Sequence, residues 1–266
     1  MAIKTIRGIQ IAYDDLGDSR SAFVFVHGQP FNRSMWNYQS GYFSKNYRLI
    51  IPDLRGYGES GVSRGIVQLD EMALDIAYLL DELSIEEAIF CGLSMGGQII
   101  LDFYRLFPQR VKALVIADSD ARGESKESYS KRLQLAETLS KGGMKKYTDE
   151  NIFQYIGSKS KERSPEMYAH LYQMMTTTNA EGSSAAQKGR AERRDHLSIL
   201  SSIKIPVLII VGSEDYFTPL PVAELMSHGI PNAQLACIEE AGHLPSMEKP
   251  AEFNEVVNRF LKENNL

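Results

Sequence analysis

A serine flanked by glycines follows an apolar stretch in the first half of the chain. Gly92-Leu93-Ser94-Met95-Gly96 comes directly after Ala88-Ile89-Phe90-Cys91, and a helical pattern begins near Met95. In a sharp turn between a strand and a helix, a serine exposes its hydroxyl as a nucleophile, and glycines are needed because a Cβ would collide with nearby backbone. An ordinary Gly-Ser loop is the alternative interpretation. The flanking strand and helix favour the nucleophile, so we predict this role for Ser94.

A serine hydroxyl is a weak nucleophile until a base removes its proton, and His243 is the predicted base. It lies in Ala241-Gly242-His243-Leu244, just after the last apolar run, Gln234–Ile238, on a loop at the carboxyl end of a strand. It also follows Ser94 in the chain order that is typical of such a turn. The other histidines lack this setting: His27, His170, His196 and His228.

Asp215 is the predicted carboxylate that orients the histidine and stabilises its protonated form. It follows the apolar run Val207–Val211 and stands between Ser94 and His243 in the chain, which is the expected order. A carboxylate at the end of the preceding strand can also reach the histidine, and three rivals stay open: Asp118, Asp120 and Glu214.

Two backbone N–H groups are expected to bind the oxygen that becomes negative when a carbonyl is attacked. The turn itself supplies the N–H of Met95. The second is expected from the loop after the first long apolar run, His27-Gly28-Gln29-Pro30. Gln29 is the candidate there, since Pro30 has no N–H. His27 is predicted to bond to loop backbone rather than to act as a base.

The apolar runs of the chain are of two kinds. Ile3–Tyr13 alternates around Gly8 and predicts an edge hairpin. Later runs are apolar on both faces, as in parallel strands that helices cover on both sides. They are Ala22–Val26, Leu49–Ile51, Ala88–Cys91, Ala113–Ile116 and Val207–Val211. Helical spacing at 69–83 and 99–107 lies between them, and this alternation predicts an α/β fold with a parallel sheet.

The alternation of strands and helices stops once, between Asp120 and Lys204. So long a segment is not expected to be a structureless loop in a compact domain, and helical patches such as 129–137 lie within it. We therefore predict a core domain made of residues 1–119 and 205–266, and a helical cap inserted at 120–204.

Composition argues against several other classes of protein. The 266 residues are 43% hydrophobic and carry a formal net charge of −5 without a basic stripe, which argues against nucleic-acid binding. No apolar run approaches the roughly 18 residues of a membrane span, and the N-terminal residues lack a secretory pattern, so we expect a cytoplasmic protein without a membrane partner. Cys91 and Cys237 have no metal-binding spacing, and the chemistry above needs neither metal nor coenzyme.

Together these motifs resemble the α/β-hydrolase superfamily, especially the branch of 3-oxoadipate enol-lactonases, small carboxylesterases and cofactor-free haloperoxidases. The resemblance rests on five motifs in order: His27–Pro30, Pro52–Ser60, Phe90–Gly97, Gly212–Asp215 and Ala241–His243. It implies the α/β-hydrolase fold, a mostly parallel twisted sheet covered by helices on both faces with an inserted helical cap. Serine at position 94 argues against the haloalkane dehalogenase and epoxide hydrolase branches, which have an aspartate there.

Two groups of residues in the inserted segment bear on the substrate. Most of its aromatic and methionine side chains are expected to form its packing core, and two or three to line an apolar acyl pocket and touch the substrate: Tyr129, Phe153, Tyr155, Tyr168, Tyr172, Met174 and Met175. Arg190, Arg193 and Arg194 are expected to form a solvated face, and attraction of a carboxylated substrate is the alternative interpretation. We therefore predict that neutral aryl esters and simple lactones are better substrates than dicarboxylate lactones.

The sequence thus predicts a serine hydrolase of small carboxylic esters or lactones that acts through Ser94, His243 and Asp215 and an acyl-enzyme intermediate. Its expected partner is a small-molecule substrate. Hydrolysis of a 3-oxoadipate enol-lactone, or of a carbon–carbon bond in a diketone, uses the same groups and is an alternative. A small-molecule receptor on a hydrolase fold is an alternative of another class.

Overall fold

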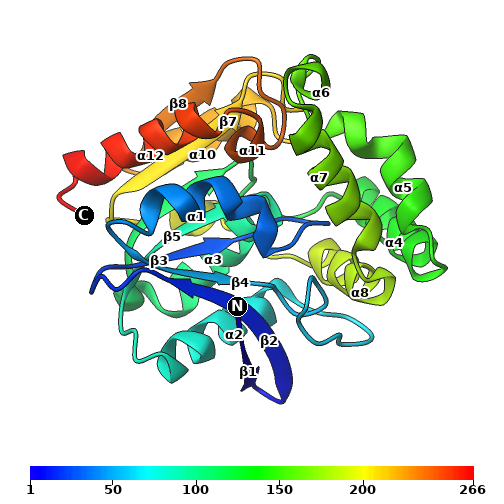
Figure 1. Cartoon of the computed structure of the whole chain (residues 1–266), viewed down its shortest axis with the longest axis horizontal. Helices are drawn as coiled ribbons and strands as arrows, with labels where there is room; N and C mark the ends of the chain where they lie inside the picture. The colour runs from blue at the N-terminus through cyan, green and yellow to red at the C-terminus, as the bar shows by residue number, and fades with distance from the viewer.

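The computed structural model describes residues 1–266, which form one eight-stranded sheet between two layers of helices (Figure 1). Across the sheet the strands lie in the order β1-β2-β4-β3-β5-β6-β7-β8. Strand β2 runs antiparallel to both of its neighbours, β1 and β4, and β3 to β8 are parallel to one another. This arrangement confirms the predicted α/β fold. The strands are β1 (Ala2–Ile6), β2 (Ile9–Leu16), β3 (Ala22–Val26), β4 (Arg48–Pro52), β5 (Ala88–Leu93), β6 (Val111–Ala117), β7 (Val207–Gly212) and β8 (Gln234–Ile238).

The first two strands form the predicted edge hairpin. Ile6 pairs with Ile9, so the turn consists of Arg7 and Gly8. Both have a positive φ, 49° and 81°, which a two-residue turn requires if its twist is to match that of the strands. The alternation of apolar and polar residues therefore correctly predicts a hairpin with one exposed face.

The parallel strands are apolar throughout because they face two separate cores. Successive side chains of a strand point to opposite sides of the sheet. In β3, Phe23 and Phe25 belong to one core, whereas Val24 and Val26 belong to the other, and all four are fully buried.

Helices cover both cores. The side containing Val24 and Val26 is covered by α2 (Leu69–Glu82), α3 (Met95–Leu106) and α10 (Leu220–Gly229), with η2 (Pro108–Arg110) after α3. The side containing Phe23 and Phe25, the nearer one in Figure 1, is covered by η1 (Arg33–Trp36), α1 (Asn37–Phe43), α11 (Pro245–Glu248) and α12 (Pro250–Glu263). No helix in the structure combines the length and the apolar character that crossing a membrane requires.

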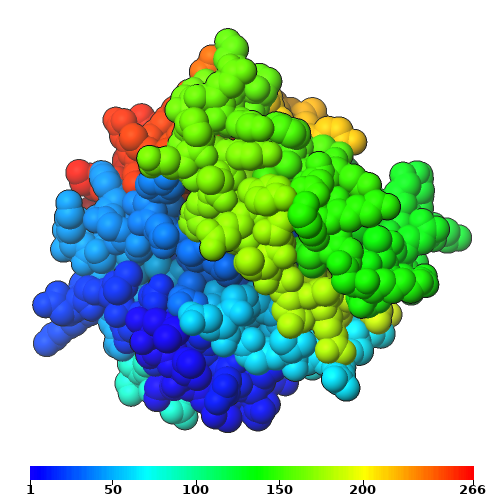
Figure 2. Space-filling view, turned by 45° about the vertical axis from the view of Figure 1, so that its right-hand side comes forward, coloured from blue at the N-terminus to red at the C-terminus, as the bar shows by residue number.

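The segment between β6 and β7 is helical and lies at the carboxyl ends of the parallel strands, on the right of Figure 1 and across the upper right of Figure 2. Its hydroxyl and backbone groups bond to the rest of the chain: Thr178 donates to the Pro30 carbonyl (2.7 Å), and the Ala185 carbonyl accepts from Val67 (3.1 Å). The division into a core domain and a cap at 120–204 stays a prediction. Its elements are α4 (Lys126–Ser140), α5 (Met144–Asn151), η3 (Ile152–Gln154), α6 (Ser160–Arg163), α7 (Pro165–Thr177), α8 (Ala180–Ala191) and α9 (Leu197–Leu200).

Ser94 stands alone between β5 and α3 in a strained conformation. Its φ is 55° and its ψ is −115°, a region that residues with a side chain rarely occupy. Its N–H donates to the carbonyl of Ala117 (2.9 Å), and its own carbonyl accepts from the hydroxyl of Ser119 (2.7 Å). The neighbouring strand β6 and the loop after it therefore hold the turn in place.

The two glycines beside Ser94 are required by close packing of backbone. A Cβ added to Gly92 would strike the carbonyl group of Gly96, and one added to Gly96 would strike the carbonyl oxygens of Val26 and His27. The turn after β5 is thus pressed against the end of β3. This contact places Ser94 beside the loop that begins at His27.

Replacing Gly96 by alanine should destabilise the fold, because the new Cβ forces the β5–α3 turn away from β3. We expect a loss of about 1–3 kcal/mol or more in the free energy of unfolding, measured by urea titration. Gly41→Ala is the matched control: Gly41 is exposed in helix α1, with no atom near its added Cβ, and alanine favours a helix by about 0.5–1 kcal/mol. Equal stability of the two variants would contradict the packing account.

Candidate active site

His243 and Asp215 form a buried hydrogen-bonded pair at the carboxyl ends of β7 and β8. The Nδ1 of His243 lies 2.9 Å from both carboxylate oxygens of Asp215. His243 is 2% exposed, and its backbone N–H donates to the carbonyl of Tyr155 (3.0 Å). Because Asp215 accepts the hydrogen of Nδ1, the other ring nitrogen, Nε2, is left as the proton acceptor.

The surroundings of Asp215 favour its ionised form. Burial opposes the charge, but the charge of protonated His243 and several hydrogen bonds outweigh burial and lower the pKa of Asp215 to about 2. These bonds come from His243, from the N–H of Phe217 (2.8 Å) and from the hydroxyl of Thr218 (2.5 Å). Asp215 is therefore a carboxylate at neutral pH and can stabilise an imidazolium.

Of the three rival carboxylates, only Asp118 lies near the pair. One oxygen each of Asp118 and Asp215 and a ring nitrogen of His243 lie within 4.8 Å of one another. Asp118 accepts from the N–H of Gly212 (2.8 Å), whereas its second oxygen has no partner. Burial, with the nearby charge of Asp215, raises the pKa of Asp118 well above its ordinary value. Of these two adjacent carboxyl groups, Asp118 is therefore the one whose pKa is raised and Asp215 the one whose pKa is lowered.

The other two rivals are engaged elsewhere. Asp120 forms an ion pair with the guanidinium of Arg122 (2.8 Å), and Glu214 accepts from the N–H of Ser158 (2.6 Å). Neither contacts His243 in the structure.

Ser94 and His243 line one cavity of about 330 Å³. Ser94 reaches it from the turn after β5, and His243 from the loop after β8. The remaining walls come from the loops after β3, β6 and β7 and from α4, α5 and α8 of the inserted segment. The lining residues are Gln29, Ser94, Gln98, Ser119, Asp120, Arg122, Glu124, Ser128, Arg132, Leu135, Tyr147, Tyr155, Gln187, Arg190, Arg193, Phe217, Thr218 and His243.

The backbone N–H groups of Gln29 and Met95 are both free beside Ser94. A Cβ added to Gly28 would lie 3.2 Å from the Cβ of Ser94, so this loop contacts the serine turn directly. The N–H of Gln29 donates to no acceptor, and Met95 is the first residue of α3, ahead of the intrahelical bonds. The Gln29 side chain is held by hydrogen bonds to Tyr57 and Ser183.

His27 bonds to loop backbone, as predicted. Its Nδ1 lies 2.8 Å from the carbonyl of Gly28, and its Nε2 accepts from the N–H of Leu54 (3.0 Å). Burial lowers the pKa of His27, which favours the neutral ring. With both nitrogens engaged, His27 fixes the loop after β3.

Glu248 is a residue that sequence analysis missed. Its carboxylate accepts from the N–H groups of Gly242 (2.9 Å) and Leu244 (3.1 Å), on either side of His243. It also accepts from the N–H of Gly157 (2.6 Å) and the hydroxyl of Ser160, both in the inserted segment. Glu248 thereby joins the histidine loop to that segment. The only sequence signal was an acidic residue shortly after the histidine, which is too common to interpret alone.

The expectation for the aromatic and methionine side chains was met in part, and the favoured one for the arginines was wrong. Five of the seven aromatic and methionine side chains belong to a core or pack against it, as expected, but only Tyr155 lines the cavity. Arg190 and Arg193 do not form a solvated face: both line the cavity and are largely buried. Only Arg194 is exposed as expected. Whether Arg190 and Arg193 are buried depends on how α8 packs, and the spacing of the arginines in the sequence does not reveal that packing.

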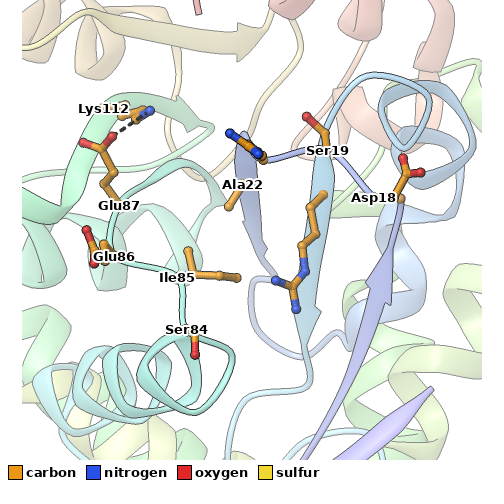
Figure 3. A pocket seen from close by; sticks show the side chains of 11 residues that line it. Asp18, Ser19, Ala22, Ser84, Ile85, Glu86, Glu87 and Lys112 are labelled. Carbon is orange, nitrogen blue, oxygen red and sulfur yellow. Dashed lines mark ion pairs between the residues drawn. The ribbon is translucent and has the colours of Figure 1, made fainter.

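A larger hollow of about 580 Å³ lies at the amino ends of the parallel strands, opposite the cavity that Ser94 lines. Its walls include the residues that precede β3 and β5, such as Ser19 and Ser84, and Lys112 at the start of β6 (Figure 3). Lys112 is paired with Glu87 (2.8 Å). No histidine lines it, so the hollow has no counterpart of the His243–Asp215 pair.

Comparison with known proteins gives the family. The family description "alpha/beta hydrolase fold" matches residues 21–250. The chain belongs to the α/β-hydrolase family. A thermophilic esterase from Thermogutta terrifontis, solved with malate bound, superposes with a TM-score of 0.96 at 32% identity, over 100% of this chain and 99% of that one. The predicted α/β-hydrolase fold is thereby confirmed.

Two relatives of known activity cover almost the whole chain. The 3-oxoadipate enol-lactonase 2 of Acinetobacter baylyi is 30% identical over 98% of this chain and 96% of its own length. The 2-hydroxy-6-oxononadienedioate/2-hydroxy-6-oxononatrienedioate hydrolase of Paraburkholderia phymatum is 29% identical over 95% and 91%. This similarity supports a hydrolase acting on a small molecule.

Asp118→Asn should stabilise the protein at neutral pH. The raised pKa of Asp118 means that the folded state keeps a proton that the unfolded chain loses above about pH 4, so folding becomes less favourable as the pH rises. Asparagine keeps the acceptor for Gly212 and has no proton to lose. Thermal unfolding should show a higher Tm than wild type at pH 7, with the gain shrinking towards pH 4. An increase in Tm that does not depend on pH, or a lower Tm than wild type at pH 7, would contradict the raised pKa of Asp118.

Proposed function

We propose that the protein is a serine hydrolase that cleaves small carboxylic esters or lactones, with Ser94, His243 and Asp215 as its catalytic residues. The observation that carries the proposal is the His243–Asp215 hydrogen bond beside a cavity that Ser94 also lines. It leaves Nε2 of His243 as the acceptor for the serine proton. No other histidine of the chain lines that cavity.

In the proposed reaction, the Oγ of Ser94 attacks the substrate carbonyl and His243 takes its proton. The resulting imidazolium is stabilised by the carboxylate of Asp215, and the N–H groups of Gln29 and Met95 bind the oxyanion. His243 then protonates the leaving oxygen, which leaves an acyl group on Ser94. Water, activated by His243, releases the acid and restores the serine.

Ester and lactone cleavage is favoured by the relatives as well as by the geometry. The relatives include an esterase and an enol-lactonase that match nearly the whole chain. The cavity of about 330 Å³ accommodates a small molecule. Carbon–carbon bond cleavage, as named for the Paraburkholderia relative, needs the same nucleophile and remains the alternative reaction.

Ser94→Ala should abolish turnover of 4-nitrophenyl acetate and leave the protein folded, because it deletes one hydroxyl from a turn that is held by backbone contacts. Stopped-flow measurement of wild type should show multiple turnovers, whereas a receptor on this fold would release at most one equivalent of product. Ser128→Ala, which removes another hydroxyl from the lining of the same cavity, is the control, because the Ser128 hydroxyl bonds to Ser125 and not to the Ser94 turn. Equal turnover by wild type and Ser94→Ala would exclude Ser94 as the nucleophile.

Asp215→Asn and Asp118→Asn should separate the two adjacent carboxyl groups. The first removes the charge that orients and stabilises His243 and should lower kcat by roughly 10³- to 10⁴-fold. The second changes a carboxyl group that is not hydrogen-bonded to His243 and should lower kcat by less than about tenfold. Steady-state kinetics on both variants, with circular dichroism to verify folding, test this difference. A larger loss of kcat in Asp118→Asn than in Asp215→Asn would indicate that the catalytic carboxylate is Asp118, at the end of β6.

A further inference from the structure

Arg190 is a buried arginine without a counter-ion. It lies in α8, is 8% exposed and lines the same cavity as Ser94. No carboxylate lies within 4.0 Å of its guanidinium, and its Nε has no hydrogen-bond partner. A buried charge of this kind is costly unless it is paired, by several kcal/mol in most proteins. The guanidinium of Arg190 therefore has a positive charge that no anion of the protein neutralises.

The other charges of the cavity do not supply that anion. Glu124 is paired with Arg132 and with Arg193 (2.8 Å), and Asp120 with Arg122 (2.8 Å). The lining thus holds four arginines against two carboxylates, a formal excess of two positive charges. Burial, followed by the charges of Arg132 and Arg193, lowers the pKa of Arg190 to about 9, which still leaves it protonated at neutral pH.

Close packing fixes the position of α8 and hence of Arg190. Gly189, the residue before Arg190, lies so near the carbonyl of Val67 that a Cβ would collide with it. At the start of the helix, Gly182 is equally close to the backbone of Gly56. The backbone that carries Arg190 is therefore fixed in the cavity wall before any ligand arrives, which lowers the entropy lost on binding.

We propose that Arg190 is an anion-binding subsite and that the substrate carries a carboxylate at a distance from the bond that is cleaved. This inference rests on the proposed function and names its substrate class. A guanidinium presents a planar fork of N–H donors that matches a carboxylate. Glu124 and Asp120 are occupied by the other arginines, so they leave Arg190 free for the ligand.

The first experiment compares two esters that differ in one charge. Mono-4-nitrophenyl adipate carries a free carboxylate, and its methyl ester is the neutral counterpart of nearly the same shape. Wild type should show the higher kcat/KM for the anionic ester, and added salt should reduce the preference. Equal values for the two esters, or a preference for the neutral one, would overturn the anion subsite. If both are cleaved with Ser94-dependent kinetics, the proposed function still stands.

Variants at Arg190 locate the effect. Arg190→Met should reduce the ratio of anionic to neutral kcat/KM by roughly 10- to 100-fold, and Arg190→Lys, which keeps the charge but not the fork, by less. Arg194→Met is the matched control: it removes the same charge from an exposed residue four positions along the chain, outside the cavity, and should leave the ratio unchanged. A similar loss in Arg194→Met would indicate a general effect of net charge and overturn the assignment to Arg190.

Binding without chemistry provides a second measurement. Titration calorimetry of the wild-type protein with adipate, inorganic phosphate and sulfate should show binding of adipate that Arg190→Met weakens by roughly tenfold or more. Tighter binding of phosphate than of adipate would contradict the carboxylate class and indicate a phosphorylated substrate. Should Arg190→Met fail to fold, Arg190→Lys and competitive inhibition of the wild type by adipate still decide the proposal. Absence of inhibition would refute it.

Discussion

The contact between the β5–α3 turn and the end of β3 positions the parts of the candidate site that lie nearest Ser94. Gly96 has no side chain, so the backbone of the turn meets the carbonyl oxygens of Val26 and His27. The same contact holds Ser94 in its strained conformation and brings the Gln29 loop beside it. The turn that carries Ser94 and the loop that carries Gln29 are therefore adjacent because backbone packs against backbone.

The two halves of the cavity have different electrostatic tasks in the account proposed above. Near Ser94, burial raises the pKa of Asp118, whereas hydrogen bonds and the charge of His243 keep Asp215 ionised. The pKa values of two adjacent carboxyl groups are thereby shifted in opposite directions. Across the cavity, Arg190 has no such partner. We infer that the first half performs acid–base chemistry and that the second selects the substrate.

Glu248 shows how the inserted segment is tied to the histidine loop. One buried carboxylate accepts hydrogen bonds from both sides of His243 and from Gly157 and Ser160 of the inserted segment. On the opposite side, Ser183 of α8 accepts from the side chain of Gln29. The segment that lines the substrate cavity is thus also bonded to the loops that carry the proposed catalytic groups.

Local patterns were enough to predict the sheet and the residues at the ends of its strands. The limits of β3 at Ala22–Val26 follow from an apolar run between polar residues, and the position of Ser94 follows from the glycines that its turn requires. The burial of Arg190 does not follow from such patterns, because it results from glycines of α8 that meet backbone more than a hundred residues earlier in the chain. Glu248 was missed for the same reason: its partners in the inserted segment are distant in sequence.

The central claim is that Ser94 attacks a carbonyl whose oxygen is bound by the N–H groups of Gln29 and Met95. A crystal structure of the protein after reaction with diethyl 4-nitrophenyl phosphate tests it most directly, because the phosphoryl group mimics the tetrahedral intermediate. We predict one covalent bond from phosphorus to the Oγ of Ser94, with the phosphoryl oxygen within hydrogen-bond distance of both N–H groups. An adduct on another residue, or a phosphoryl oxygen directed away from Gln29 and Met95, would contradict the account.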